Sequence, residues 1–463
     1  MSTLGKRIKR ARQAVGLTQE ELGGPELTKG FISSLEHDRT RPSAATLVRL
    51  AARLGRRVSY FLNGESVVSE KVLALLENQG QGELARGEYN SARDAFGELA
   101  ELATACRSEV MKARAELGLG ETELGAGRHC EARPYFDNAL KAGRMTKDPL
   151  TECRALYGLG LVEYHQSDFL QAVTLHEEAL VVLTRLREPE TLLEGEIHLY
   201  LGTALMRLGR MEEAVWAFTR ARDLFSEPAQ PQWAGQVLTA LGEISAKNGD
   251  WKGALELYER ALVLFRQCDE GSAAAHVRSD LGLLLLERGR PQEALEHFGA
   301  ALTIRERLKD RAGECRVLTE LARCYFVCGD LVRAEEYANR ASVSSREIGQ
   351  PEAETRARIV LGMVAADAGN IEEAEREILA AQQQSRMLGM IPDLVATCCE
   401  LGWLAKWRGR YKEAEANYEQ AYEALKAVKP NDTVAVLHLA DLAGLRAKFA
   451  RAQDERHHSP QGG

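Results

Sequence analysis

Small and apolar residues recur along most of the chain with a constant long period. Beyond Glu65 the pattern is a small residue, six positions, glycine, four positions, alanine, then a large residue and a further alanine, as in LGEISAKNGDWKGALELYERAL. A repeat of this length indicates stacked structural units rather than one ordinary core. The alanines at the fixed position are 40 residues apart, except for one step of 42, and predict nine units: Ala92, Ala132, Ala172, Ala214, Ala254, Ala294, Ala334, Ala374 and Ala414.

Two other positions of the repeat predict a pair of helices in each unit. Five residues before each alanine lies a glycine, or Ser167 in the third unit, where the chain turns between two helices. Twelve residues before it lies a glycine, or Ala322 in the seventh unit, which lets neighbouring helices approach closely. This pattern over residues 70 to 428 resembles the tetratricopeptide repeat, lengthened by about six residues. The resemblance implies a right-handed superhelix whose first helices line a concave channel.

The N-terminal segment has a different pattern, with two short amphipathic runs in LTQEELGGPELTKGFISSLE, residues 17 to 36. Thr18 and Glu21 have the spacing of a capping box, which predicts a helix start at Thr18. The following GGP stops that helix, and Thr28 repeats the start signal. The second helix has an outward face of polar residues without acids. Such a face suits a helix that enters the major groove of DNA.

The flanking segments complete a small helical domain. LGKRIKRARQAVG predicts a basic helix that ends at Gly16, and Ser43 caps a helix that ends at Gly55. With RIKRARQAVGLTQEEL, TKGFISSLEHDRTRPS and LVRLAARLG, the segment from Leu4 to Leu62 resembles the helix-turn-helix domain of the Xre family. The resemblance implies contacts to double-stranded DNA from a phosphate-binding residue, an outward recognition face and two arginines beyond it: Gln19; Thr28, Lys29, Gly30, Ser33 and Ser34; Arg39 and Arg41.

Charge is distributed unevenly between these two parts. Residues 1 to 64 hold 12 Lys/Arg and 5 Asp/Glu, a net charge of +7, which leaves −15 on the remainder of a chain whose net charge is −8. A basic domain of this kind usually faces phosphates, although a solvated surface gives the same count. We expect a cytoplasmic protein without a membrane segment, because no stretch approaches the roughly 20 apolar residues that a membrane span needs.

The sequence contains few signals of enzyme chemistry. LGLGETELGAG clusters glycines, but they coincide with the small positions of the repeat and no GK[ST] follows, so a nucleotide-binding loop is not expected. HExxH and the nucleophile elbow are both absent from the sequence. The nine cysteines lack paired CxxC spacing, which argues against a disulfide framework or structural zinc. We therefore expect no enzyme activity, no cofactor and no metal.

The register of the first helices predicts which side chains face the channel. Positions −6, −3, +1 and +4 or +5, counted from the small residue of each first helix, form the inward set. These side chains could hold a peptide carboxylate or an apolar side chain; alternatively, about half of them pair with one another along the inner helices. The candidate ligand-binding residues are Arg154, Tyr157, Tyr164, Arg207, Gln236, Lys247, His276, Arg316, Arg323 and Arg356.

An Xre-type domain followed by tetratricopeptide repeats resembles the RRNPP family of bacterial regulators. That resemblance implies an all-α protein that binds DNA and senses a short signalling peptide in the repeat channel. The alternative is an interaction protein whose repeats recruit or sequester a partner protein, with little direct gene regulation. For the first function we expect a homodimer, since a single small domain makes a limited interface with DNA.

The sequence divides into four expected segments. Residues 1–64 form the helix-turn-helix domain and residues 65–429 the repeat array. Residues 430–455 contain an amphipathic run, TVAVLHLADLAGLRAKFA, which we expect to cap the last repeat or to dimerise. Residues 456–463 are expected to be a disordered tail.

Overall fold

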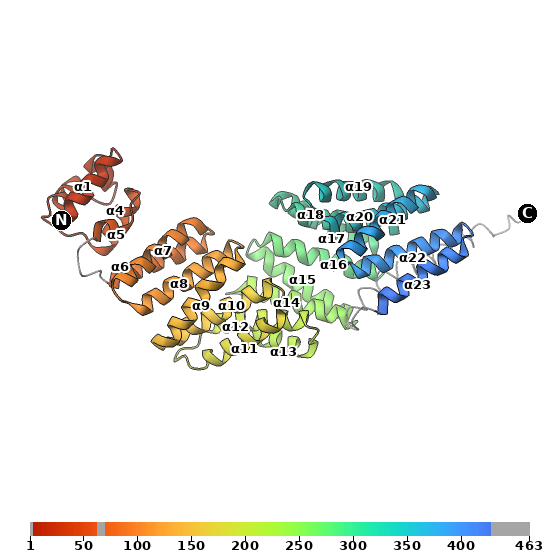
Figure 1. Ribbon diagram of the computed structural model, residues 1–463, viewed down its shortest axis with the longest axis horizontal. Helices are drawn as coiled ribbons and strands as arrows, with labels where there is room; N and C mark the ends of the chain where they lie inside the picture. The colour runs from red at the N-terminus through yellow and green to blue at the C-terminus, as the bar shows by residue number, and fades with distance from the viewer. Residues whose placement is uncertain (1–2, 63–69, 427–463) are drawn as a thin grey trace, which may run out of the picture. The chain divides into compact units, whose positions relative to one another are not determined.

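The computed structural model describes residues 3–62 and 70–426. Every regular element in these ranges is a helix, which confirms the all-α fold (Figure 1). The chain forms two compact units, Met1–Leu224 and Phe225–Gly463, called here the N-terminal and C-terminal units. The segments 430–455 and 456–463, for which a capping or dimerisation helix and a tail are predicted, lie outside the described residues.

Five short helices come first in the N-terminal unit: α1 (Leu4–Ala14), α2 (Gln19–Gly23), α3 (Lys29–Glu36), α4 (Ala44–Arg53) and α5 (Val58–Leu62). Hydroxyl caps start three of them, as the sequence predicts. Thr18, Thr28 and Ser43 each accept a hydrogen bond from the backbone N–H three residues later.

Helix pairs follow. Those of the N-terminal unit are α6 (Glu70–Ala85) with α7 (Tyr89–Ala105), α8 (Glu109–Gly125) with α9 (His129–Thr146), α10 (Pro149–His165) with α11 (Phe169–Leu183), and α12 (Thr191–Arg207) with α13 (Met211–Leu224). Those of the C-terminal unit are α14 (Pro231–Lys247) with α15 (Trp251–Gln267), α16 (Gly271–Glu287) with α17 (Pro291–Leu308), α18 (Arg311–Val327) with α19 (Leu331–Glu347), α20 (Pro351–Asp367) with α21 (Ile371–Leu388), and α22 (Ile391–Trp407) with α23 (Tyr411–Lys426).

The repeated small residues permit close packing within each pair. A Cβ added to Gly120 would lie 2.8 Å from the ring of Phe136, and one added to Gly282 would lie 2.7 Å from the ring of Phe298. The seventh unit departs from the pattern at both positions. Ala322 replaces the glycine and Ala338 replaces the large residue, and both are fully buried. The small residue at 338 leaves room for the methyl group of Ala322, which would clash with a ring at that position.

The turn inside each pair needs a left-handed residue. Gly87, Gly127, Gly209 and their counterparts in the C-terminal unit all have φ between +71° and +83°. Ser167 takes the same position in the third pair with φ +65°. The turn geometry is therefore kept even where glycine is absent.

First helices of successive pairs stand beside one another in each unit. Helix α8 contacts α6 and α10, and α10 contacts α12; in the C-terminal unit α16, α18, α20 and α22 follow in the same way from α14. These surfaces are called the N-terminal wall (α6, α8, α10, α12) and the C-terminal wall (α14, α16, α18, α20, α22).

The small N-terminal helices share their hydrophobic core with the first repeats. Leu47 and Leu50 of α4 belong to the same buried cluster as Leu73 and Leu76 of α6 and Leu99 of α7. Helix α4 packs on α6 and α5 packs on α7. The boundary predicted between residues 64 and 65 falls in the segment 63–69, which is not among the described residues.

Candidate functional site

A tight turn joins α2 to α3. The Thr18 hydroxyl accepts the N–H of Glu21 at 3.1 Å, and the Glu21 carboxylate accepts the N–H of Thr18 at 2.6 Å, so the predicted capping box is present. The hydroxyl of Thr28 accepts the N–H of Phe31 at 3.2 Å and starts α3. Between them, Gly24 adopts φ +57°, a conformation that favours glycine. Local hydrogen bonds thus define both ends of the turn.

Arg53 of α4 holds this turn from outside. Its Nη1 donates to the carbonyl oxygen of Leu22 at 2.9 Å and also to that of Gly23. The last carbonyls of a helix lack partners within the helix, so the guanidinium acts as a C-terminal cap. A Cβ on Gly24 would lie 2.7 Å from the same guanidinium. Arg53 was not among the residues expected from the sequence, because its partners lie some 30 positions away.

Arg12 of α1 fixes the other end of α3. Its Nε and Nη2 donate to the two carboxylate oxygens of Glu36 at 2.6 and 3.1 Å, while its Nη1 donates to the carbonyl of Leu17 at 2.6 Å. Burial raises the pKa of Glu36, but hydrogen bonds from Arg12 and Gln19 outweigh this and keep the pKa below its ordinary value. Glu36 is therefore an ionised, fully paired carboxylate inside the domain.

The outward face of α3 carries the side chains predicted to meet bases. Thr28, Lys29 and Gly30 are exposed, whereas Ser33 and Ser34 are half-buried. A Cβ at Gly30 would have no neighbour within 4 Å, so the backbone is open there.

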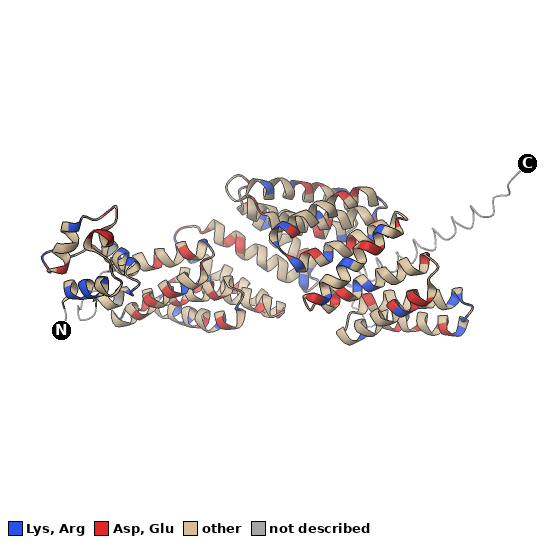
Figure 2. Cartoon of the chain, turned by 90° about the horizontal axis from the view of Figure 1, so that it is seen from above, with Lys and Arg blue, Asp and Glu red and all other residues tan. Residues whose placement is uncertain are grey.

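Basic residues follow α3 in the chain and also occur on α1, which packs against α3. Arg39 and Arg41 are exposed beyond the end of α3. Helix α1 carries five Lys or Arg residues and no acid, visible as the blue helix next to the N-terminus in Figure 2. Exposed cations close to a polar helix face favour contacts to the phosphates of a nucleic acid.

Gln19 has a second role besides the one expected from the sequence. It is half-buried, and its amide Nε2 donates to Glu36 at 2.7 Å. The amide group is thus part of the network that joins α1, α2 and α3. A phosphate contact by Gln19 stays a prediction. The amide would then have to bind the phosphate and Glu36 at the same time.

Four of the ten candidate ligand residues lie in the N-terminal unit. Arg154, Tyr157 and Tyr164 are half-buried on α10, and Arg207 is exposed at the end of α12. The Tyr157 ring lies 5.9 Å from that of Tyr200 and 5.8 Å from that of His176. Arg207 stacks over the ring of Phe169 at 5.1 Å.

Two carboxylates complete this part of the wall. Burial raises the pKa of Glu121, and burial raises the pKa of Glu196 to about 7, despite a hydrogen bond from Tyr157 and the nearby charge of Arg154. Both are half-buried. Neither was singled out from the sequence, although the register rule places Glu121 at +1 and Glu196 at −6. Applying that rule to every repeat would have identified them.

The other six candidates lie on the C-terminal wall, and most of their charges are already engaged. Arg323 donates to Glu320 at 2.7 Å, Lys247 donates to Glu243 at 2.7 Å, and Arg356 lies 3.4 Å from Asp393. Other placements are simpler: Gln236 is half-buried on α14, His276 lies 3.6 Å from Asp280 on α16, and Arg316 is exposed on α18. Burial raises the pKa of Asp280 to about 6.

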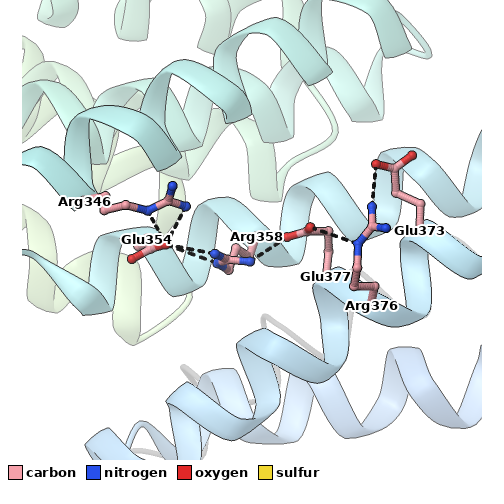
Figure 3. Close-up of polar contacts among 6 residues, drawn as sticks. All are labelled: Arg346, Glu354, Arg358, Glu373, Arg376 and Glu377. Atoms are coloured by element: carbon pink, nitrogen blue, oxygen red, sulfur yellow. Dashed lines mark hydrogen bonds and ion pairs between the residues drawn. The ribbon is translucent and has the colours of Figure 1, made fainter.

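A chain of ion pairs joins three helices of the C-terminal unit. One oxygen of Glu354 on α20 accepts hydrogen bonds from Arg346 of α19 at 2.9 Å and from Arg358 of α20 at 3.1 Å. The chain continues from Arg358 into α21, as Figure 3 shows, through Glu377, Arg376 and Glu373. These arginines are held by protein carboxylates and stabilise the stacking of the repeats.

Family models match both parts of the chain. Residues 8–61 match the helix-turn-helix model, and residues 160–350 match the model of the MalT-like TPR region. Tetratricopeptide-repeat models also match residues 78–146, 117–188 and 355–379. The domain types expected from the sequence are confirmed.

One curated relative matches the N-terminal part. The immunity repressor protein of Bacillus phage phi105 is 36% identical over 70 residues, which cover 15% of this chain and 49% of the repressor. The chain therefore spans about half the length of the relative it matches.

Solved structures resemble the larger part of the chain in fold. The apo form of the quorum sensor NprR from B. thuringiensis has a TM-score of 0.64 at 14% identity, over 77% of this chain and 99% of NprR. A Rap protein complexed with Competence and Sporulation Factor has a TM-score of 0.55 at 17% identity, over 77% of this chain and 98% of Rap. Among the described helices, none is both long and apolar enough to cross a membrane. The chain thus combines a helix-turn-helix domain with an array of tetratricopeptide repeats.

Proposed function

We propose that this chain is a DNA-binding transcriptional regulator whose α3 enters the major groove. Lys29 is the main candidate for reading bases, since it is exposed at the start of α3 and a lysine can donate to guanine O6 and N7. Thr28, Ser33 and Ser34 are candidates for further contacts to base edges. Arg39 and Arg41 are candidates for the phosphate backbone, where their contribution does not depend on sequence.

One observation supports this function above the others. Glu36, the acidic residue of α3, is buried in the domain and forms an ion pair with Arg12. The outward face of α3 therefore presents hydroxyl, ammonium and backbone groups. A carboxylate on that face would be repelled by DNA phosphates. The arrangement removes this penalty while keeping the glutamate as a structural group.

The functional form is proposed to be a homodimer. A single domain of this size buries a limited area on DNA, and such domains reach higher affinity by reading two half-sites about one helical turn or more apart. The hydrophobic core that α4 and α5 share with the first repeats links each helix-turn-helix domain to its own repeats. The distance between the two helix-turn-helix domains of a dimer can then depend on the conformation of the repeats.

We further propose that the repeat walls bind a short peptide and that its binding changes DNA affinity. The tyrosines of α10 and α12 offer apolar contacts, while Glu121 and Glu196 offer acceptors for a peptide amine. Arg316 and Arg323 on α18 are the candidates for a carboxylate. Arg323 would have to exchange Glu320 for the ligand. The fold shared with the quorum sensor NprR supports a sensory role for these walls.

A second candidate is an interaction protein that recruits or sequesters a partner protein through the same walls. The paired cations of the C-terminal wall favour this reading, because fewer charges remain for a small anionic ligand. DNA binding by the N-terminal domain would then be weak and indifferent to sequence.

DNA binding is tested by mapping which genomic fragments the purified protein retains, followed by titration of one retained fragment and a random duplex. Lys29→Ala should lose about 1–3 kcal/mol on the retained fragment only, whereas Arg41→Ala should weaken both duplexes and flatten the salt dependence. Lys412→Ala, an exposed lysine of the last repeat, is the matched control. Equal losses on both duplexes for Lys29→Ala would remove it from the base-reading set.

Peptide sensing is tested through thermodynamic reciprocity. If a peptide changes operator affinity by some factor, the operator must change peptide affinity by the same factor, with a coupling typically of about 1–3 kcal/mol. Peptides from a library are titrated against wild type and Arg323→Ala, with and without operator. If no peptide binds, or if binding ignores both the mutation and the DNA, the interaction-protein function replaces the sensory one.

A further inference from the structure

The single irregular step of the repeat coincides with a cavity in the N-terminal unit. The step from Ala172 to Ala214 is the one of 42 residues. Here α11 ends at Leu183 and α12 begins at Thr191, so residues 184–190 form the connection, whereas two residues join α9 to α10. A cavity of about 700 Å³ lies beside this long connection. Its size is within the range of small-molecule sites.

The walls of this cavity are apolar and aromatic. Leu180 and Leu183 of α11 line it together with Pro189 of the connection and Trp216 of α13. Trp216 is 57% exposed, which is unusual for the largest apolar side chain. An indole left accessible beside leucines offers a face on which a planar apolar group can stack.

A buried imidazole is among the groups that line the cavity. His198 is 4% exposed, and its ring lies edge-on to Trp216 with centroids 5.4 Å apart. Within the described ranges its Nδ1 has no hydrogen-bond partner. Burial, with the charge of Arg220 as a smaller cause, lowers the pKa of His198 to about 4, so the ring is neutral at pH 7. A neutral buried nitrogen without a partner is costly, but this atom is closed to solvent, so the ring contributes packing to the site and not a hydrogen bond to a ligand.

Charges of both signs surround the cavity without pairing. Arg187 and Arg220 line it, as do Glu188, Glu190 and Glu194. In the part of the chain that the structure describes, none of these five makes an ion pair within 4 Å, although most other arginines of the repeats do. A purely anionic ligand would meet three carboxylates here, and a purely cationic one would meet two guanidinium groups. A zwitterion satisfies both sets.

We propose that this cavity binds a free α-amino acid with an aromatic side chain. The ring stacks against Trp216 and the leucines, and the ammonium and carboxylate groups meet the unpaired glutamates and arginines. The ring of His198 contacts the indole of Trp216 edge-on and so supports the surface on which the ligand stacks. This site is separate from the DNA-reading face and from the candidate residues of the walls, and it does not depend on the function proposed for either.

Calorimetric titration of the full-length protein with L-phenylalanine tests the site. Binding is expected, and phenethylamine and 3-phenylpropionate, which each lack one charge, should bind at least about tenfold more weakly. Trp216→Ala should reduce the affinity for L-phenylalanine by about tenfold or more. Trp407→Ala, which removes a similarly exposed indole from the C-terminal unit, should leave it unchanged.

Arg220→Gln provides a variant at an exposed position, where the fold is not at risk. It should weaken L-phenylalanine but not phenethylamine, because only the former has a carboxylate. Absence of binding at millimolar L-phenylalanine overturns the proposal. So does a singly charged analogue that binds as tightly as L-phenylalanine, or an affinity that is unaffected by both Trp216→Ala and Arg220→Gln in folded protein.

Discussion

The guanidinium of Arg12 contacts both carboxylate oxygens of Glu36, at 2.6 and 3.1 Å, and so ties α1 to α3. The Glu36 side chain is completely buried and that of Arg12 is 12% exposed. Charged groups rarely occupy such positions unless they are paired, and removing one partner leaves the other charge buried. This pair therefore positions the candidate recognition helix as well as clearing its outward face of negative charge.

Glu36→Ala should destabilise the first three helices by about 3 kcal/mol, because Arg12 would keep its charge without its partner. Hydrogen exchange of the α1–α3 amides measures the loss. Glu20→Ala removes an exposed acid from α2 and should change exchange little, by a few tenths of a kcal/mol at most. Unchanged exchange in Glu36→Ala would show that the pair is not important for stability.

The same pair has a defined pH dependence. Because the pKa of Glu36 is lowered on folding, its contribution is complete above the unfolded value of 4.5 and is lost as the pH falls below it through the folded value. Glu36→Gln should lack this part of the acid sensitivity of α1–α3. If wild type and Glu36→Gln lose amide protection in parallel below pH 4.5, other groups determine the acid response.

His176 replaces the usual large apolar residue of the repeat. It is fully buried beneath Gly160, and neither ring nitrogen has a hydrogen-bond partner among the described residues. Burial lowers its pKa to about 3 from 6.5. The unfolded chain therefore binds more protons between these values, and stability falls as the pH drops below 6.5, by about 1 kcal/mol per pH unit.

His176→Phe should stabilise the N-terminal unit by about 1–3 kcal/mol at neutral pH and reduce its acid sensitivity, since no polar atom would be buried unpaired. Denaturant unfolding at pH 7 and pH 5 measures both effects. The reverse exchange in the preceding repeat, Phe136→His, should introduce the same acid sensitivity. A His176→Phe protein that is no more stable than wild type at either pH would contradict this account.

The repeat frame was predictable because it depends on backbone geometry and residue size. Gly120 and Gly282 lie against rings, and Ser167 turns with positive φ, as their spacing indicates. The contacts of Arg53, Arg12 and Gln19 were not predictable, since their partners lie 17 to 31 positions away and long side chains can reach several acceptors. Side-chain partners therefore needed the three-dimensional structure.

Gly282 and Phe298 should behave as a coupled pair. Gly282→Ala would place a Cβ 2.7 Å from the Phe298 ring and should cost about 1–3 kcal/mol. Phe298→Ala leaves a cavity and should cost about 3–5 kcal/mol. The double variant reproduces the Ala322 and Ala338 combination of the seventh unit, so its cost should be smaller than the sum of the two. Strict additivity in denaturant unfolding would show that the two side chains do not compete for the same space.

Glu354 is the acceptor shared by Arg346 and Arg358 (Figure 3). Glu354→Gln should destabilise the packing of α19 on α20 by about 1–3 kcal/mol, because two guanidinium groups would lose their common carboxylate. Hydrogen exchange of α19–α21 reports this effect, which should shrink at high salt. Glu352→Gln alters an exposed residue of the same helix and serves as the control. Equal exchange in the two variants would mean that the ion-pair chain adds nothing to stability.

The common core of the helix-turn-helix domain and the first repeats should make them one cooperative unit. Leu76 of α6 is 2% exposed and belongs to the buried cluster that contains Leu47 and Leu50 of α4. Leu76→Ala should therefore cost about 2–5 kcal/mol and lower amide protection in α4 as well as in α6. Leu302→Ala makes a comparable cavity in the C-terminal unit and should leave α4 unaffected. If Leu76→Ala lowers protection only in α6, the helix-turn-helix domain opens independently of the repeats. Ligand binding on the walls would then not be coupled to DNA binding through this core.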